Sequence, residues 1–392
     1  MKNGVEHFAA DKIFDGDTMH RDAVLHVSAG VVQGIRPRNE SGGSLTDLGD
    51  VTLAPGFIDW QVNGGGGVMF NDSPSAEGIA TIARAHAACG TTTLLPTLIT
   101  DAPEAMDAAA AAVAAARAAG MASIAGIHFE GPHLSLARQG AHEAGFIRPM
   151  EESDHERLAR RDLGVVLTTL APESASLADI RRLVDAGVLV SLGHSDCDYE
   201  MAWRAFSAGA RAVTHIFNAM SGLGHRAPGL AGAALDHPGV TCGLIADGHH
   251  VHPAACRIAI RAKPAGQVTF VTDAMACVGG GTDGFTLNGR PVRRRGGRLE
   301  LEDGTLAGSD LDMASALRYA ATHLGLPVEE ALRMAALYPA RLLRLEDARG
   351  HLRPGARADM VALDGELRPR AVWIGGVAQP AAQSPDRPDR LA

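Results

Sequence analysis

The chain has 392 residues, of which 46% are hydrophobic and 21% charged, and its net charge at pH 7 is −9. These values are ordinary for a globular protein; they exclude a disordered or fibrous chain and leave room for one large domain with a small companion. The longest basic run, residues 293–295, is too short to neutralise many phosphates, and no stretch could span a bilayer, so we expect no nucleic-acid or membrane partner.

The cysteines and the first residues bear on where the protein works. The five cysteines are odd in number and scattered, with no CxxC pair, which disfavours a disulfide framework and fits a reducing compartment. The opening segment, "MKNGVEHFAADKIF", lacks the apolar core of a secretory signal. We therefore expect a soluble protein of the cytoplasm.

Short apolar runs alternate with Ala- and Leu-rich segments through the middle of the chain. Runs of this kind indicate strands that are buried on both faces. The segment "DAPEAMDAAAAAVAAARAAG" is compositionally simple, but alanine is the strongest helix former, so we predict a helix there. The eight runs are residues 51–58, 92–98, 123–129, 165–170, 188–192, 212–216, 240–245 and 268–271. This repetition predicts an α/β fold, a (β/α)8 TIM-like barrel.

The two ends of the chain differ from the middle. Residues 1–53 and 350–380 contain short strands and turns, which predicts one small β-sandwich domain built from both termini. Residues 54–349 would then form the barrel, with a hairpin insertion near 279–308. The last residues, 381–392, have the composition of a disordered tail.

Polar residues end several of the runs. The active site of such a barrel lies at the carboxyl ends of its strands, so these side chains should meet there. Glu130, His194 and His215 end or follow the third, fifth and sixth runs. One carboxylate and two imidazoles leave a coordination position open for water, which is the pattern of a catalytic zinc site. For any one of them alone, a hydrogen-bonded core residue is the competing interpretation.

Asp273 ends the last run. A carboxylate beside a metal-activated water can accept its proton and later pass it to a leaving group. The competing interpretation is an N-cap or turn aspartate, because "TDAM" could begin a helix. The sequence leaves both open.

A set of motifs, in order along nearly the whole chain, resembles the N-acetylglucosamine-6-phosphate deacetylases of the amidohydrolase superfamily. The motifs are "APGFIDWQVNGGGG", "TTTLLPTLIT", "GIHFEGPHLS", "QGAHEAGFIR", "SLGHSD", "THIFNAM", "RAPGLAGAAL", "IADGHHVH", "VTDAM" and "GTLAGS". "RAPGLAGA" and "IADGHHVH" are specific to this family, whereas the strand-end ligands are shared across the superfamily.

The resemblance implies a role for each matching residue. Glu130, His194 and His215 would hold the metal, Asp273 would be general base and then general acid, and His142 would polarise the acetyl carbonyl. Asn218, the Ala219 backbone, Arg226 and His250 would hold the phosphate and sugar. It also implies a homodimer in which Arg226 or His250 serves the neighbouring subunit, and hydrolysis of N-acetylglucosamine 6-phosphate to glucosamine 6-phosphate and acetate.

Gln61 and Asn63 stand where many amidohydrolases carry His-x-His, the ligands of a second metal. Neutral amides are weak ligands for zinc, so we expect a single divalent metal ion per subunit. Zinc suits the three remaining ligands, with iron, manganese and cobalt as alternatives. Gln61 would hydrogen-bond the activated water, and Asp59 would orient a neighbouring ligand.

Two other functions compete with this interpretation. One is an amidohydrolase acting on another N-acyl amino sugar or on an N-acyl amino acid; the phosphate ligand in "HRAPGLAGA" argues against it. The other is a barrel kept only as a binding protein, and the intact metal set together with Asp273 argues against that.

Overall fold

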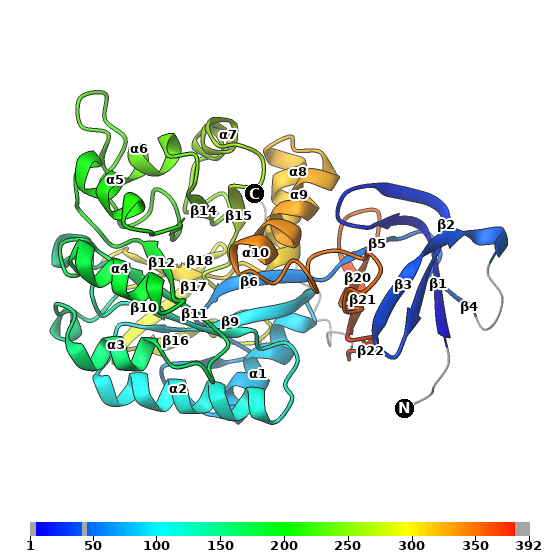
Figure 1. The fold of residues 1–392 in the computed structure, drawn as a ribbon, viewed down its shortest axis with the longest axis horizontal. Coiled ribbons are helices and arrows are strands. Elements are labelled where there is room, and N and C mark those ends of the chain that lie inside the picture. The colour runs from blue at the N-terminus through cyan, green and yellow to red at the C-terminus, as the bar shows by residue number, and fades with distance from the viewer. Residues whose placement is uncertain (1–4, 41–44, 381–392) are drawn as a thin grey trace.

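The computed structural model describes residues 5–40 and 45–380. The predicted disordered tail at 381–392 lies outside the described residues. A helix-covered barrel and a smaller β-sheet unit lie side by side (Figure 1).

The barrel contains eight strands in the order β15-β14-β13-β12-β11-β10-β9-β6, and every pair in this path is parallel. The strands are β6 (Phe57–Val62), β9 (Thr91–Ile99), β10 (Gly126–Glu130), β11 (Val165–Leu170), β12 (Leu189–Leu192), β13 (Ala212–Val213), β14 (Thr241–Leu244) and β15 (Val268–Phe270). Nearly all of these residues are buried, because helices cover the outer face and side chains fill the interior. The predicted fold class is confirmed.

The barrel closes between β6 and the segment that follows β15. The amide of Asp273 donates to the carbonyl of Gln61 over 3.0 Å, and the amide of Asn63 donates to the carbonyl of Ala274 over 2.9 Å. This closure brings two parts of the chain that are more than 200 residues apart into contact at the carboxyl end of the barrel.

The first predicted strand, residues 51–58, was wrong at both ends. The run is divided at Gly56: β5 (Thr52–Pro55) belongs to the small sheet, and β6 continues to Val62. A Cβ at Gly56 would lie 2.3 Å from the Thr92 side chain, so only glycine fits this crossing point. The polar residues Asp59 and Gln61 interrupt the apolar pattern, so the sequence does not mark the rest of β6 as a buried strand.

Helices alternate with the barrel strands along the chain and surround the barrel in space (Figure 1). They are α1 (Ala76–Ala87), α2 (Pro103–Ala118), α3 (Glu152–Leu158), α4 (Leu177–Asp185), α5 (Tyr199–Ser207), α6 (Gly229–Asp236), α7 (Pro253–Ala262), α8 (Met313–His323), α9 (Val328–Ala335) and α10 (Leu337–Leu342). Helix α2 is the predicted alanine-rich one; Pro103 starts it and its inner face packs Met106 and Val113 into the core. None of the helices in the described part of the chain is long and apolar enough to cross a membrane.

The small sheet takes strands from both ends of the chain. They are β1 (Val5–Phe14), β2 (Met19–Ser28), β3 (Val31–Pro37), β4 (Leu45–Asp47), β5, β20 (Met360–Leu363), β21 (Pro369–Ile374) and β22 (Val377–Ala378), all in one hydrogen-bonded sheet. Phe8 and Leu25 from the amino-terminal strands pack with Trp373 from β21 in a core of its own. The two ends of the chain thus depend on each other for burial.

The segment predicted as a hairpin near 279–308 forms four antiparallel strands instead. They are β16 (Gly284–Leu287), β17 (Arg290–Arg295), β18 (Arg298–Glu300) and β19 (Leu306–Ser309). Leu287, Val292 and Leu299 give this sheet an apolar face that packs near the mouth of the barrel. Arg294, from the basic run, is only 13% exposed and pairs with the buried Asp310 over 2.6 Å.

Candidate active site

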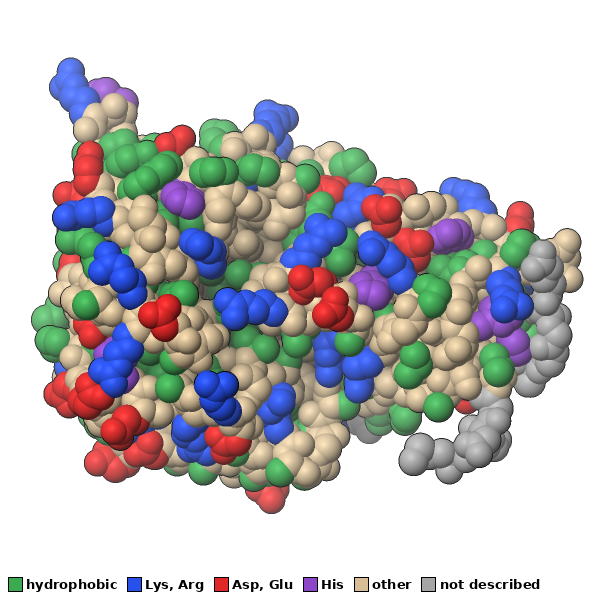
Figure 2. Space-filling model, viewed as in Figure 1, with side chains coloured by type: hydrophobic (Ala, Val, Ile, Leu, Met, Phe, Trp, Pro, Cys, Tyr) green, Lys and Arg blue, Asp and Glu red, His purple; other side chains and the backbone are tan. Residues whose placement is uncertain are grey.

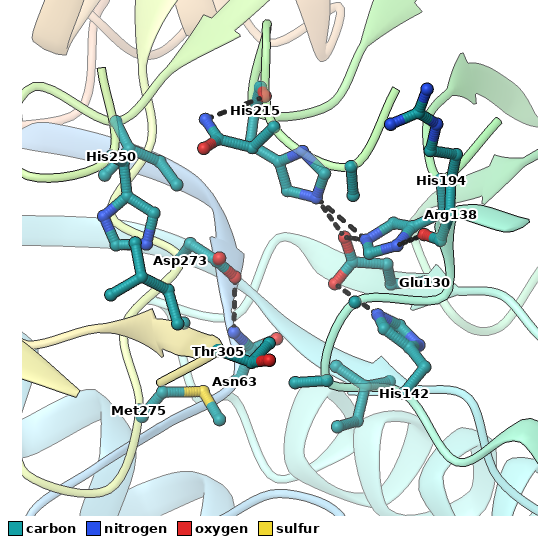
Figure 3. A pocket seen from close by; sticks show the side chains of 18 of the residues that line it. Asn63, Glu130, Arg138, His142, His194, His215, His250, Asp273, Met275 and Thr305 are labelled. Atoms are coloured by element: carbon teal, nitrogen blue, oxygen red, sulfur yellow. Dashed lines mark hydrogen bonds and ion pairs between the residues drawn. The ribbon is translucent and has the colours of Figure 1, made fainter. Parts of the chain in front are cut away.

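A cavity of about 420 Å³ opens where the barrel strands end, and most of the predicted site residues line it (Figure 3). The predicted residues in its wall are Asn63, Glu130, His142, His194, His215, Asn218, Ala219, His250 and Asp273. They come from the ends of β6, β10, β12, β13, β14 and β15 and from the loops that follow. The carboxyl ends of the strands therefore gather these side chains, as expected for a parallel barrel.

Glu130, His194 and His215 converge at one point of the cavity (Figure 3). Nε2 of His215 lies 3.0 Å from Oε1 of Glu130 and 3.0 Å from Nε2 of His194. Nε2 of His194 lies 3.4 Å from the same carboxylate oxygen. All three side chains are buried, and together they form a group with metal-ligating geometry.

The distances within this group fit a shared metal ion. Two ligands bound tetrahedrally to zinc at about 2.0–2.1 Å lie roughly 3.3 Å apart, close to the three separations seen here. The Nε2 atoms of His194 and His215 are 3.0 Å apart, so there is room for only one hydrogen between them. A metal ion bound by both nitrogens would take the place of that hydrogen. The residues present therefore fit one divalent metal ion.

Hydrogen bonds behind the group orient its members. Nδ1 of His194 lies 2.9 Å from the backbone carbonyl of Arg138, so Nδ1 carries the hydrogen and Nε2 is free to bind metal. Burial opposes charge on Glu130 and on His215. Hydrogen bonds with His194 and His215 outweigh burial and hold the pKa of Glu130 well below its usual range, and the hydrogen bond with Glu130 raises the pKa of His215. A metal ion would replace the proton that this pair otherwise shares.

Three of these strand-end residues have strained backbones. The φ angles of His194, His215 and Asp273 are 49°, 33° and 52°, a region that non-glycine residues seldom adopt. Such strain costs of order 1–3 kcal/mol per residue and clusters at functional sites. The strained turns direct these side chains into the cavity.

Asp273 faces the metal-ligating group across the cavity and is held by two amides. Nδ2 of Asn63 donates to Oδ1 of Asp273 over 2.6 Å, and Nε2 of Gln61 donates to the same oxygen over 3.1 Å. Nε2 of Gln61 also donates to Oε1 of Glu130 over 3.0 Å, which links the two carboxylates. Burial and the nearby Glu130 raise the pKa of Asp273 to about 6, a value suited to a proton shuttle.

His142 lies beside the metal-ligating group, with Nε2 4.0 Å from Oε2 of Glu130. Its Nδ1 accepts a hydrogen bond from the backbone amide of Thr100 over 3.3 Å. Burial and the neighbouring His194 hold the pKa of His142 well below its usual range, so the ring is neutral. A neutral ring that accepts at Nδ1 carries its hydrogen on Nε2, the nitrogen that faces the cavity.

Asp59 is fully buried behind the cavity wall. Its Oδ2 accepts from the Thr272 hydroxyl over 2.5 Å and its Oδ1 from the backbone amide of Gln61 over 3.2 Å. Burial raises its pKa to about 7. Asp59 therefore joins β6 to the segment that carries Asp273, and it contacts none of the three metal-ligating residues directly.

Arg226, unlike most of the predicted site residues, lies away from the cavity of its own chain. It lies exposed on the loop 221–228 between β13 and α6. This loop projects from the upper left of the molecule in Figure 1, and a cationic tip projects at the same place in Figure 2. Leu223, on the same loop, is 56% exposed.

Several cavity residues were not found from the sequence. Arg138 places a cation in the wall, where its guanidinium pairs with Asp196 over 2.8 Å. Met275, Leu287 and Leu306 make one side of the cavity apolar. No sequence signal marked them, because Leu287 and Leu306 belong to the insertion and reach the cavity only through the packing of its sheet.

Comparisons with known proteins agree with this geometry. The family model "Amidohydrolase family" matches residues 52–387. The chain is 43% identical over 369 residues to the N-acetylgalactosamine-6-phosphate deacetylase of Shewanella sp. (strain ANA-3), covering 93% of each chain. It is 39% identical over 343 residues to the mouse N-acetylglucosamine-6-phosphate deacetylase, covering 84% of each.

Solved structures give the same result. The N-acetylglucosamine-6-phosphate deacetylase of Pasteurella multocida superimposes with a TM-score of 0.93 at 31% identity, over 96% of this chain and 99% of that one. An aspartate-to-alanine mutant of the Mycobacterium smegmatis enzyme, in complex with N-acetyl-D-glucosamine-6-phosphate, has a TM-score of 0.89 at 33% identity, over 95% and 99% of the chains.

Fold and site thus define a hydrolase on a (β/α)8 barrel with a group of residues suited to binding a metal ion. The chain belongs to the amidohydrolase family. The relatives named above are amino-sugar-phosphate deacetylases, which confirms the resemblance inferred from the sequence.

Proposed function

We propose that the protein hydrolyses the acetamide of N-acetylglucosamine 6-phosphate to give glucosamine 6-phosphate and acetate. The observation that carries this proposal is the convergence of Glu130, His194 and His215 on one point, with Asp273 and His142 on either side. A structural relative binds this same substrate. An intact set of reactive groups also argues against a barrel that serves only for binding.

Glu130, His194 and His215 would hold one divalent metal ion, with zinc favoured by the ligand set and iron, manganese or cobalt as alternatives. When bound, such an ion polarises a water molecule and the substrate carbonyl. Gln61 donates a hydrogen bond to Glu130, and Asn63 donates one to Asp273. These amides therefore present N–H donors at the positions where a second metal ion would need ligands.

Asp273 would take a proton from the attacking water and deliver it to the departing amine. The two amide donors hold one of its oxygens, Oδ1, in place and leave the other, Oδ2, for the transferred proton. His142 would donate a hydrogen bond from Nε2 to the acetyl oxygen as negative charge develops there. Asp59 would hold β6 against the segment that carries Asp273, through the hydrogen bond that it accepts from Thr272.

The phosphate and sugar would be held by Asn218, the Ala219 backbone and His250, which line the cavity. Arg226 would reach the phosphate of a neighbouring subunit in a homodimer, because it lies on a projecting loop away from its own cavity. We propose the cytoplasm as the location; all five cysteines are free, in keeping with a reducing compartment.

The galactosamine epimer is a second candidate substrate, because the 43% identical relative is named for it. Acetate release from the 6-phosphates of both N-acetyl sugars, with an N-acetyl amino acid as a third substrate, tests the proposal. A higher kcat/KM for the glucosamine sugar supports the function proposed. A higher value for the galactosamine sugar selects the second candidate, and hydrolysis of the amino acid alone would overturn both.

A further inference from the structure

Asp247 and His250 form a buried pair on the loop that follows β14. Nδ1 of His250 lies 2.5 Å from Oδ2 of Asp247, and the two side chains are only 6% and 8% exposed. Oδ1 of the same carboxylate accepts the backbone amides of His249 and His250 over 2.8 and 2.9 Å. Gly248, with φ of +79°, makes this tight turn. One carboxylate thus holds both the turn and the ring.

The contact fixes the hydrogen on the ring. Burial opposes ionisation of Asp247, but its hydrogen bonds with the His250 ring and the two amides outweigh burial and hold its pKa below the ordinary value. An ionised carboxylate only accepts, so Nδ1 of His250 carries a hydrogen. Among the described residues Nε2 has no hydrogen-bond partner, and the ring lines the cavity opposite the metal-ligating group (Figure 3).

We propose that Asp247 is a positioning residue for phosphate recognition: it binds Nδ1–H of His250 and so keeps Nε2 of the ring directed into the cavity. This inference rests on the proposed function, in which His250 binds the substrate phosphate. A charge-assisted hydrogen bond between an imidazole and a phosphate is roughly twice as strong as a neutral one. An uncharged sugar hydroxyl gains far less from the same ring, so the pair favours phosphorylated sugars.

The variant Asp247→Asn separates the two duties of the carboxylate. Its amide oxygen can still accept the two backbone amides, while its NH2 group faces Nδ1 and cannot accept the ring hydrogen, so the contact that holds the ring is lost. In the metal-loaded enzyme we expect the ratio of kcat/KM for N-acetylglucosamine 6-phosphate to that for N-acetylglucosamine to fall about tenfold, mainly through KM. The inhibition constant of inorganic phosphate should rise by a similar factor.

Two further variants make the test specific. In a His250→Gln background, adding Asp247→Asn should change the ratio by less than about twofold, because the ring through which Asp247 acts is gone. Asp236→Asn removes one carboxylate that instead accepts from Tyr199 on the outer surface, and it controls for loss of charge alone.

Two results would overturn the inference. One is an equal fall with both sugars, which would assign Asp247 to the turn only; the other is an undiminished effect in the His250→Gln background. Failure of the proposed function looks different: the unmodified enzyme itself would then show no preference for the phosphorylated sugar.

Discussion

The backbone amide of Thr100 donates a hydrogen bond to Nδ1 of His142 over 3.3 Å. An amide hydrogen cannot be moved to another atom, so this contact requires Nδ1 to be an acceptor. The Thr100 hydroxyl lies 2.8 Å from the same nitrogen and 3.3 Å from the backbone carbonyl of Glu130, and its one hydrogen can be donated to either. His142 therefore presents Nε2–H to the cavity whether or not a substrate is bound, and no rearrangement is needed before it stabilises an oxyanion.

His142→Ala should lower kcat by about 10²–10³-fold with a small change in KM, the range seen when one oxyanion donor is removed. Thr100→Val is the matched control: it keeps the backbone amide, so the orientation of the ring hydrogen survives and the loss of kcat should be much smaller. Steady-state acetate release measures both. A Thr100→Val loss as large as that of His142→Ala would show that the hydroxyl, not the amide, orients the ring.

Asp273→Asn should bind substrate but lose nearly all turnover, because the amide cannot accept a proton. In the unmodified enzyme only ionised Asp273 is a base, so kcat/KM should decrease as pH falls through its pKa. That pKa is raised to about 6 by burial and Glu130, and a cation on Glu130 lowers it again. The acidic limb of the pH profile should therefore lie at or below about pH 6. Substantial residual turnover in the variant would remove Asp273 as the proton shuttle.

Much of this architecture could be predicted from the sequence. Continuous apolar strands separated by helical segments are the strongest sequence signal of such a barrel. Glu130 ends one of these strands, and His194 and His215 lie two residues beyond the ends of theirs. The errors have a physical origin. Residues 59 and 61 are polar yet lie inside β6, because they hydrogen-bond across the barrel closure to Thr272 and Asp273. The four-stranded insertion was taken for a hairpin, and contacts such as Thr100–His142 and Asp247–His250 depend on loop conformations that residue patterns do not encode.

One tightly bound metal ion per chain is expected. Gln61 directs its NH2 group at both Glu130 and Asp273, so two N–H donors occupy the place where a second cation would bridge the carboxylates. Metal analysis after dialysis should return about one equivalent, and Glu130→Gln should return far less, because a neutral amide is a poor ligand. Two equivalents retained by the unmodified protein would contradict this account.

Arg226→Ala should raise KM for the phosphorylated sugar and leave kcat nearly unchanged, since the residue is proposed to contact only the phosphate. Arg21→Ala, another exposed arginine on the small sheet, is the control. If Arg226 serves the neighbouring subunit, mixing Arg226→Ala with Asp273→Asn subunits should restore a normal low KM in the mixed dimers. No restoration in mixed dimers would place Arg226 in its own chain's site or outside any site.

The central claim is a metal-dependent hydrolase that selects a phosphorylated amino sugar. The most direct test is acetate release from N-acetylglucosamine 6-phosphate and from N-acetylglucosamine, each with and without a chelator. The account predicts a strong preference for the phosphorylated sugar, abolished by the chelator and restored by adding back a divalent metal. Equal activity on both sugars, or full activity in the metal-free protein, would contradict it.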